Sequence, residues 1–393
     1  MTWVERRWGG DPGAVGGSRA RQGFSYRAFV PSPIARIDPT VSFATARAID
    51  DAEMLVGRLN ADERVRGLDA IGPLLLRSEA IASSRIEGIE LSQRNLARAL
   101  IDPRAAKGSA KAVAANVVAM EEAVAVGGRG SALTTEDLLG IHRILMTDAS
   151  PRIRPGSFRQ EQNWLGGRFS NPSDATYVPP PEDEVEALML DLVYFVNRDD
   201  LPAIAQAAIA HAQFETIHPF VDGNGRVGRA LIHVILRRRG LALAFVPPIS
   251  VVLAARPGRY VDGLVAFREG RLGAWYDVFA EACARAASQS IDLAARIEAL
   301  ETTWFERAGR PRRDSAAARI IKVIPAQPIM SAATIRAAID ARHQRALEGL
   351  KHLAASGVVR QISRGDYDKQ YAADELFDLI EDFEQRVATA RNW

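Results

Sequence analysis

Apolar residues recur at intervals of three or four positions along most of the chain, which is the spacing of an α-helix with one buried face. This pattern predicts helices over residues 43–60, 73–88, 110–125, 138–146, 182–197, 203–217, 226–238, 261–268 and 275–302. Alternation of apolar and polar residues, which is typical of strands, is confined to short segments such as 24–30 and 358–362. The chain is therefore predicted to be mostly α-helical.

Breaks in the pattern divide the chain into five regions. Residues 1–35 are rich in Gly, Arg and Pro and show no period, so we expect a flexible arm with a short strand near its end. Helical patterns cover an N-terminal region, 36–109, and a central core, 110–303. A change of composition at 304–314 predicts a linker, and residues 315–393 form a last domain with an acidic tail.

Composition excludes several classes of protein. The 393 residues are 47% hydrophobic and 25% charged with a net charge of +2, as in an ordinary globular protein. The single cysteine, Cys283, excludes internal disulfides and cysteine-cluster metal sites. No apolar run approaches the roughly 18 residues of a membrane span, and the N-terminus lacks the apolar segment of a secretory signal. We therefore expect a cytoplasmic protein without a membrane partner.

The last domain has the order of elements of a winged helix-turn-helix. Three short amphipathic helices are predicted at 315–324, 331–340 and 342–356. Residues 306–365 contain twelve Lys or Arg against four Asp or Glu, whereas the counts from residue 366 onward are three and eight. The basic surface favours contact with DNA through the third helix. The alternative is a domain that serves only for packing or dimerisation.

A turn-rich segment interrupts the helical pattern at 163–181. Residues 164–168 and 177–181 flank an Asn-Pro-Ser-Asp turn, which is the pattern of a β-hairpin or flap. The alternative is an ordinary surface loop.

Residues 218–229, His-Pro-Phe-Val-Asp-Gly-Asn-Gly-Arg-Val-Gly-Arg, concentrate polar residues and glycines between two apolar helices. Backbone N–H groups of the Gly-Asn-Gly loop at 223–225 would form a concave nest for an anion, and the N-terminus of the next helix adds its positive dipole end. Arg226 and Arg229 lie three apart on that helix and can each hold a phosphate. Phosphate is therefore the predicted ligand.

Two further side chains of this segment are suited to phosphate chemistry. Asp222 precedes the nest and can hold Mg²⁺, because one carboxylate together with phosphate oxygens is a usual arrangement for that ion. His218 is the general-base candidate of the segment. Phe220 is expected in the core and His211 in a structural or supporting position. Taken singly, each of these residues also has a purely structural explanation.

An upstream carboxylate lies at an unfavourable position. Ser83 and Glu87 are four residues apart near the predicted C-terminal end of helix 73–88, and helix C-termini favour cations rather than anions. Glu87 is therefore interpreted either as a solvated surface residue or as a carboxylate that faces a cationic partner.

The segment 218–229 matches the pattern H-P-F-x-D-G-N-G-R-x-G-R of the Fic family at every specified position. The chain resembles this family in three further places. Residues 83–88 are similar to its inhibitory motif, [S/T]-x-x-x-E-[G/N], and residues 163–181 to its target-docking flap. A C-terminal winged helix occurs in one bacterial branch of the family. The resemblance implies a Fic-fold helical core with a small hairpin flap.

The resemblance also implies an activity. Fic enzymes transfer AMP from ATP to a Ser, Thr or Tyr hydroxyl of a target protein and release pyrophosphate. By this analogy His218 accepts the hydroxyl proton, Asp222 holds Mg²⁺, and the target docks along the flap 163–181. The implied nucleotide-binding residues are Gly223, Asn224, Gly225, Arg226, Val227, Gly228, Arg229, which would bind the γ-phosphate, and Tyr260, which would lie near the base.

In the family, the glutamate of the inhibitory motif suppresses the reaction. We therefore expect Glu87, supported by Ser83, to pair with Arg229 and to displace the γ-phosphate. Some family members with such a glutamate remove AMP instead, so the reverse reaction is one alternative, and a nucleotide-sensing DNA-binding regulator is another. Members that transfer phosphate itself carry Lys at the position of Gly225, which this chain does not follow. Family members often form homodimers.

Overall fold

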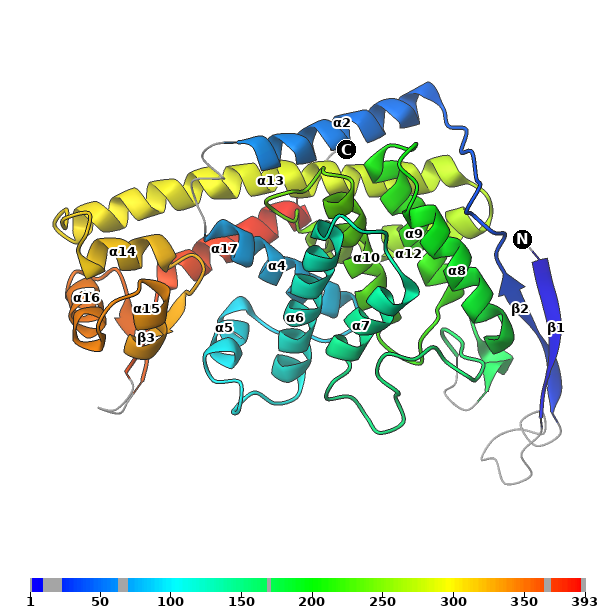
Figure 1. Cartoon of the computed structure of the whole chain (residues 1–393), viewed down its shortest axis with the longest axis horizontal. Coiled ribbons are helices and arrows are strands. Elements are labelled where there is room, and N and C mark those ends of the chain that lie inside the picture. Colours follow the sequence, from blue (N-terminus) through cyan, green and yellow to red (C-terminus); the bar gives the residue numbers. More distant parts are fainter. Residues whose placement is uncertain (1, 10–22, 63–69, 168–170, 364–368, 390–393) are drawn as a thin grey trace.

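The computed structural model describes the chain except residues 1, 10–22, 63–69, 168–170, 364–368 and 390–393. It is an elongated, mostly helical molecule, as predicted. A β-hairpin lies at one end of the long axis and a small helical unit at the other (Figure 1). Among the described residues, no helix is both long enough and apolar enough to cross a membrane.

Two helices form the centre of the molecule, α9 (Ala203–Ile217) and α10 (Asn224–Arg238). Every residue of α9 is buried, which is possible because the helix is rich in Ala and small apolar residues on all sides. The helices around this pair are α4 (Ile71–Ile86), α5 (Gln93–Ile101), α6 (Ser109–Gly128), α7 (Thr135–Leu145), α8 (Val185–Val196), α11 (Ile249–Ala255) and α12 (Pro257–Arg268).

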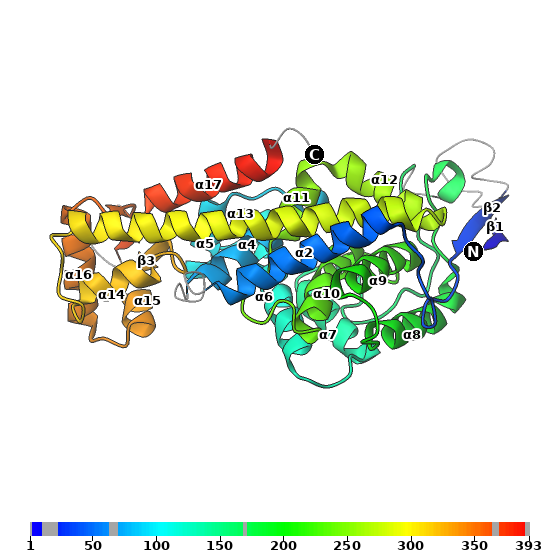
Figure 2. The same cartoon turned by 90° about the horizontal axis from the view of Figure 1, so that it is seen from above.

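A 36-residue helix, α13 (Leu272–Arg307), runs along the molecule between α2 (Phe43–Ala61) and α17 (Asp374–Thr389), as Figure 2 shows. It continues through the first four residues of the predicted linker 304–314. Trp304 is fully buried there and donates its indole N–H to Glu375 Oε2 at 2.6 Å. The linker prediction is therefore wrong for residues 304–307, because Trp304 supplies an apolar anchor that keeps the helix packed.

The N-terminal arm contains ordered structure that the sequence analysis missed. Strand β2 (Phe24–Val30), which was predicted, pairs in antiparallel register with β1 (Thr2–Trp8), which was not. The Phe29 N–H donates to Val178 O at 2.9 Å, so the hairpin is attached to the segment that precedes α8. Within residues 2–9 and 23–35, which the structure describes, cross-strand pairing and this contact replace the flexible arm that we expected; the rest of that prediction lies outside the described residues.

The C-terminal unit follows α13. Its elements are α14 (Ala316–Val323), β3 (Ile329–Ser331), α15 (Ala332–Ala338), α16 (His343–Ala355), β4 (Arg360–Gln361) and β5 (Gln370–Ala372), and it ends with α17. The three strands pair in the order β3-β5-β4. The acidic tail is not an extended segment, because most of it forms helix α17. Its carboxylates pair with arginines of other elements, as in Arg296–Asp382 at 2.6 Å and Arg307–Glu375 at 2.9 Å.

Candidate functional site

The loop between α9 and α10 has a conformation that only a few residues can adopt. His218 ends α9 with a φ of 51°, and Gly223 begins the turn into α10 with a φ of 83°. Both are left-handed, which a glycine adopts readily and other residues rarely. The Asn224 side chain closes the loop, accepting from Phe220 N and donating to Phe220 O, both at 2.8 Å. The loop is therefore fixed before any ligand binds.

Side chains from three other parts of the chain support this loop. His142 stacks on Phe220 at 3.7 Å between ring centroids and contacts Asp222 O through Nε2 at 3.1 Å. Buried Arg159 donates from Nε to His218 O at 3.0 Å and also bonds backbone carbonyls nearby. Asn163 donates to Phe220 O at 3.0 Å. These contacts satisfy carbonyl groups that the left-handed turn leaves without helical partners.

The N-terminal end of α10 forms an anion cradle. Val227 N donates to Gly223 O and is the first N–H of α10 with an intrahelical partner, so those of residues 224–226 are available to a ligand. The Arg226 guanidinium lies on the same turn, 3.6 Å from Asp222 Oδ1. Asp222 itself is 56% exposed. A cavity of about 340 Å³ opens beside these two charged side chains.

His218 is held as a neutral imidazole. Burial lowers its pKa to about 4, with the charge of Glu87 opposing the shift and that of Arg159 adding to it. At neutral pH the ring is therefore uncharged, with one nitrogen protonated and the other able to accept a proton. Its Nδ1 lies 3.9 Å from Glu215 Oε2, one helical turn earlier on α9. Burial raises the pKa of Glu215 to about 7.

Arg229 is the most deeply buried cation of the site, and it is bonded to the end of α4. Its Nε donates to Ser83 Oγ at 2.8 Å, and its Nη2 donates to Ser83 O at 2.7 Å and to Glu87 Oε1 at 2.8 Å. Burial raises the pKa of the Glu87 carboxyl, but the charge and hydrogen bond of Arg229 outweigh this, so the pKa lies below its ordinary value. The pair is therefore ionised at neutral pH.

The glycine at 225 makes room for this ion pair. A Cβ atom at Gly225 would collide with Glu87 Oε1 and would lie 2.8 Å from Arg229 Nη1. Glu87 Oε1 thus lies beside Gly225 and Arg229, at the N-terminal end of α10.

Four residues that were predicted to contact the nucleotide make contacts within the protein instead. The Gly223 N–H donates to Asp222 Oδ1 at 2.6 Å. The Asn224 side chain points into the loop, where it bonds the backbone of Phe220. Val227 is fully buried in the core. Gly228 faces α9, where a Cβ atom would collide with Glu215 Oε1. These residues build the loop and its packing, and the open groups of the cradle are the N–H groups of 224–226.

Tyr260 lies behind the site rather than in an open base pocket. It is 4% exposed, and its hydroxyl contacts His211 Nε2 at 2.8 Å. Burial raises the pKa of Tyr260 and lowers that of His211 to about 3, so both are neutral. The prediction that Tyr260 lies near a nucleotide base is therefore not supported by its position, whereas the supporting position expected for His211 is observed.

The flap is close to the site but is not a regular hairpin. One bridge, between Leu165 and Tyr177, holds its two sides together, and a 3₁₀ helix (Pro172–Asp174) lies between them. Residues 168–170 of the predicted flap lie outside the described residues. Asn163, at the base of the flap, donates to carbonyls of the loop after α9, so the flap and the anion cradle are attached to each other.

Three residues of the site were missed by sequence reasoning. Glu215 could have been found, because it lies three residues before His218 on the same face of a helix. The roles of Arg159 and His142 could not be predicted from neighbouring residues. Their partners in the loop lie 59 and 80 residues away in the chain. Such contacts arise only when the helices have packed.

A histidine with a left-handed backbone conformation thus lies beside an anion cradle and two arginines on a helical fold. Two family models cover this site, the Fic/DOC family N-terminal region over residues 46–125 and the Fic/DOC family over residues 132–236. Residues 46–125 and 132–236 are therefore similar to the two Fic/DOC family models, and these regions include Glu87 and the loop 218–229.

Curated relatives match part of this chain, and solved structures share its fold. The chain is 34% identical over 118 residues to "Protein adenylyltransferase Fic" of Drosophila virilis and 33% identical to that of Drosophila melanogaster. These matches cover 29% of this chain and 22% of each relative, so the chain spans about a fifth of their length. A Fic family protein from Desulfovibrio desulfuricans G20 superposes with a TM-score of 0.53 at 22% identity, over 85% of this chain and 97% of that one. Fic-1 of C. elegans (residues 134–508) gives 0.50 at 22% identity, over 63% and 72%.

Proposed function

We propose that this protein transfers AMP from ATP to a hydroxyl side chain of a target protein and releases pyrophosphate. The observation that carries the proposal is the neutral, largely buried imidazole of His218 next to a preformed cradle of N–H groups and two arginines. Transfer of a phosphoryl-type group needs positioning and charge stabilisation more than covalent chemistry, and these groups supply both. The names of the curated relatives support the same reaction.

In the proposed step, His218 takes the proton of the target hydroxyl on Nε2, since Nδ1 faces Glu215. The hydroxyl oxygen forms a bond to the α-phosphorus, and the bond from that phosphorus to the pyrophosphate oxygen breaks. The N–H groups of 224–226 and Arg226 hold the phosphate oxygens, and Arg229 holds the γ-phosphate once Glu87 has left. The proton on His218 is then lost to solvent.

Mg²⁺ fits this site through a single carboxylate. Asp222 is half-exposed at the rim of the cradle and keeps Oδ2 available, because its bonds to Gly223 and Arg226 use Oδ1. No group of three candidate ligands is found among the described residues. Asp222 would therefore hold the ion together with phosphate oxygens, and the ion would neutralise charge on the triphosphate.

The proposal is tested by intact-mass spectrometry of the Glu87→Gly variant after incubation with ATP and Mg²⁺. We expect auto-modification by one adenylyl group. A gain of a phosphate, or no adduct on the chain or on any added protein, would contradict the proposed reaction.

The presence of Glu87 is also compatible with the reverse reaction, the removal of AMP. In that alternative the Glu87 carboxylate orients a water molecule that removes AMP from a modified target. Wild-type protein and the Glu87→Gly variant, incubated with an AMP-modified target, distinguish the two directions: loss of AMP only with the wild type would favour removal.

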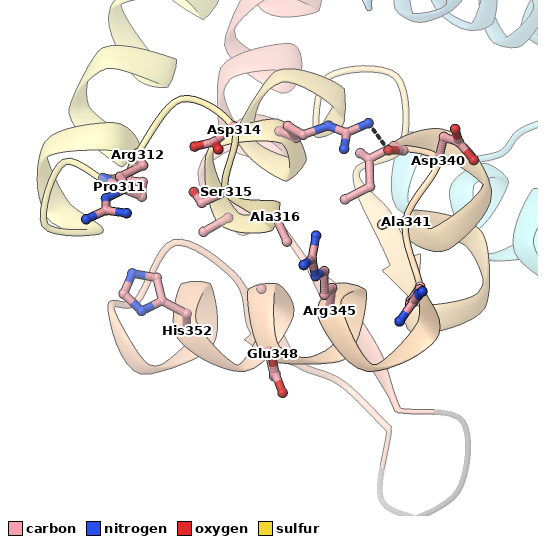
Figure 3. A pocket seen from close by; sticks show the side chains of 15 residues that line it. Pro311, Arg312, Asp314, Ser315, Ala316, Asp340, Ala341, Arg345, Glu348 and His352 are labelled. Carbon is pink, nitrogen blue, oxygen red and sulfur yellow. Dashed lines mark hydrogen bonds between the residues drawn. The ribbon is translucent and has the colours of Figure 1, made fainter.

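A second function is favoured by one surface of the C-terminal unit. The order of its helices and strands supports a winged helix-turn-helix, and helix α16 presents exposed basic residues. Between α14 and α16 lies a groove of about 760 Å³ whose lining includes Arg312, Arg342, Arg345 and His352, several of them visible in Figure 3. Positive charge on the exposed face of a helix suits the phosphate backbone of a DNA duplex.

Replacing Arg342 and Arg345 by Ala is expected to weaken DNA binding by this unit. The slope of the logarithm of the binding constant against the logarithm of the salt concentration should fall by about one for each phosphate contact that is lost. Fluorescence anisotropy with a labelled duplex at several salt concentrations measures both. Arg47→Ala, on the exposed face of α2, is the matched control. Equal affinity and equal salt slope for the double variant and the control would contradict a DNA-binding role for α16.

A further inference from the structure

Glu215 is a buried carboxyl group for which the fold makes space but provides no hydrogen-bond partner at Oε1. Because Gly228 has no side chain, there is room beside it for Glu215 Oε1. That oxygen has no hydrogen-bond partner among the described residues. The Nδ1 atom of His218, 3.9 Å from the other carboxylate oxygen, is likewise buried without a partner. An unpartnered carboxyl group is costly to bury, so its retention beside the imidazole calls for a function.

We propose that Glu215 is the positioning residue of His218, an inference that rests on the proposed function. When the target hydroxyl gives its proton to Nε2, the ring becomes an imidazolium and its Nδ1–H carries part of the new charge. The Glu215 carboxylate closes onto this N–H and stabilises the imidazolium, as a carboxylate does for the histidine of a catalytic triad. Hydrogen bonds of this kind are often long before substrate binds.

The ionisation of Glu215 depends on the groups around it. Those that face it are His211 and His218 on α9, Arg229 on α10, Glu87 after α4, and Tyr260 and Arg268 on α12. Burial, aided by the charge of Glu87, raises the pKa of Glu215 to about 7 against the opposing charges of Arg229 and Arg268. Since only the ionised carboxylate stabilises the imidazolium, transfer should increase as the pH rises through neutrality.

The test is made in the Glu87→Gly background, where transfer is measurable. Glu215→Gln keeps the volume of the side chain and removes its charge, and we expect the rate to fall about 10- to 100-fold. The increase with pH near neutrality should disappear, while the KM for ATP stays the same. An unchanged rate would overturn the inference, and so would a lower rate with the parent's pH profile, which a purely structural role predicts. Absence of transfer in the Glu87→Gly parent would overturn the proposed function and this inference with it.

A separate set of contacts joins the inhibitory helix α4 to the C-terminal unit. Glu384 of α17 pairs with Arg85 of α4 at 3.3 Å and accepts from Gln93 of α5 at 3.0 Å. Gln93 in turn donates to Ser78 of α4 at 3.0 Å. In the middle of α4, Arg77 donates to Ala326 O at 2.5 Å. The helix that ends at Glu87 is thus held by residues about 240 to 300 positions later in the chain.

We infer that the C-terminal unit is a latch for α4 and that moving this unit frees Glu87 from Arg229. Arg85 is only two residues before Glu87, so the contact with α17 and the contact with Arg229 restrain the same turn of helix. The other surface of the unit, around α16, is exposed and can bind a partner without blocking the active site. A ligand that pulls on the unit would therefore act on the catalytic site through α4.

Glu384→Arg places two like charges opposite each other and should open the latch. We expect α4 to exchange its amide hydrogens faster with deuterium, and auto-modification to rise about 3- to 10-fold above wild type. Asp382→Asn is the matched control, because Asp382 lies on the same helix but pairs with Arg296 and Arg386. The combination Arg85→Glu with Glu384→Arg should restore protection.

Equal exchange of α4 in Glu384→Arg and in the control would overturn the latch, whatever the activity. Faster exchange without any transfer by either Glu384→Arg or Glu87→Gly would instead overturn the proposed function and leave the latch supported. The two failures are therefore distinguishable in one set of samples.

Discussion

Glu87→Gly is expected to raise AMP transfer about 10- to 100-fold. The variant removes a charge-assisted hydrogen bond to Arg229, and such bonds contribute about 1.5 to 3 kcal/mol. The γ-phosphate then gains the guanidinium that Glu87 occupies, and the space above Gly225 becomes free. Transfer to the chain itself or to an added protein, followed with labelled ATP and Mg²⁺, gives the rate.

Two comparisons make this result specific. Glu90→Gly, the same substitution three residues later on an exposed position, should behave as the wild type. Glu87→Gln should give an intermediate rate, because it keeps the volume above the cradle but loses the charge. Since the pKa of Glu87 is depressed, the ion pair persists above that pKa and is lost only as the pH falls through it. No increase in either Glu87 variant would contradict autoinhibition by this residue.

His218→Ala in the Glu87→Gly background is expected to reduce transfer by about 10²- to 10⁴-fold, which is the usual contribution of a general base. The cradle does not depend on the imidazole, because Asn224 and His142 hold the loop by contacts to Phe220 and Asp222. ATP affinity, measured by calorimetry, should therefore change little. The loss should appear in kcat rather than in the KM for ATP.

The control is His343→Ala, an exposed histidine at the start of α16. Its transfer rate should equal that of the Glu87→Gly parent. If His218→Ala kept the parent's rate, the proton would have to leave the target hydroxyl by another route. If the variant lost ATP binding as well, His218 would be part of the nucleotide site rather than its base.

The sequence determined the features that are local. Helical spacing placed α9 at its observed bounds and α10 within two residues of its start. The motif at 218–229 predicted a helix–loop–helix with its N-terminal dipole at an anion cradle, because loop dihedrals and helix starts are set by neighbouring residues. The pairing of Glu87 with Arg229 was predicted from the resemblance to the Fic family. The structure places the two side chains in contact.

Only the tertiary structure decided which contacts the candidate site residues make. Asn224 holds the loop, Tyr260 contacts His211, and Glu215 lies 3.9 Å from His218. The N-terminal hairpin and the packing of α17 along α13 were equally absent from the pattern, since strand pairing and helix docking bring together residues far apart in the chain. Periodicity reports which face of a helix is buried, but not what buries it. That choice depends on packing over the whole molecule, and here it pairs Glu384 of α17 with Arg85, two residues before Glu87.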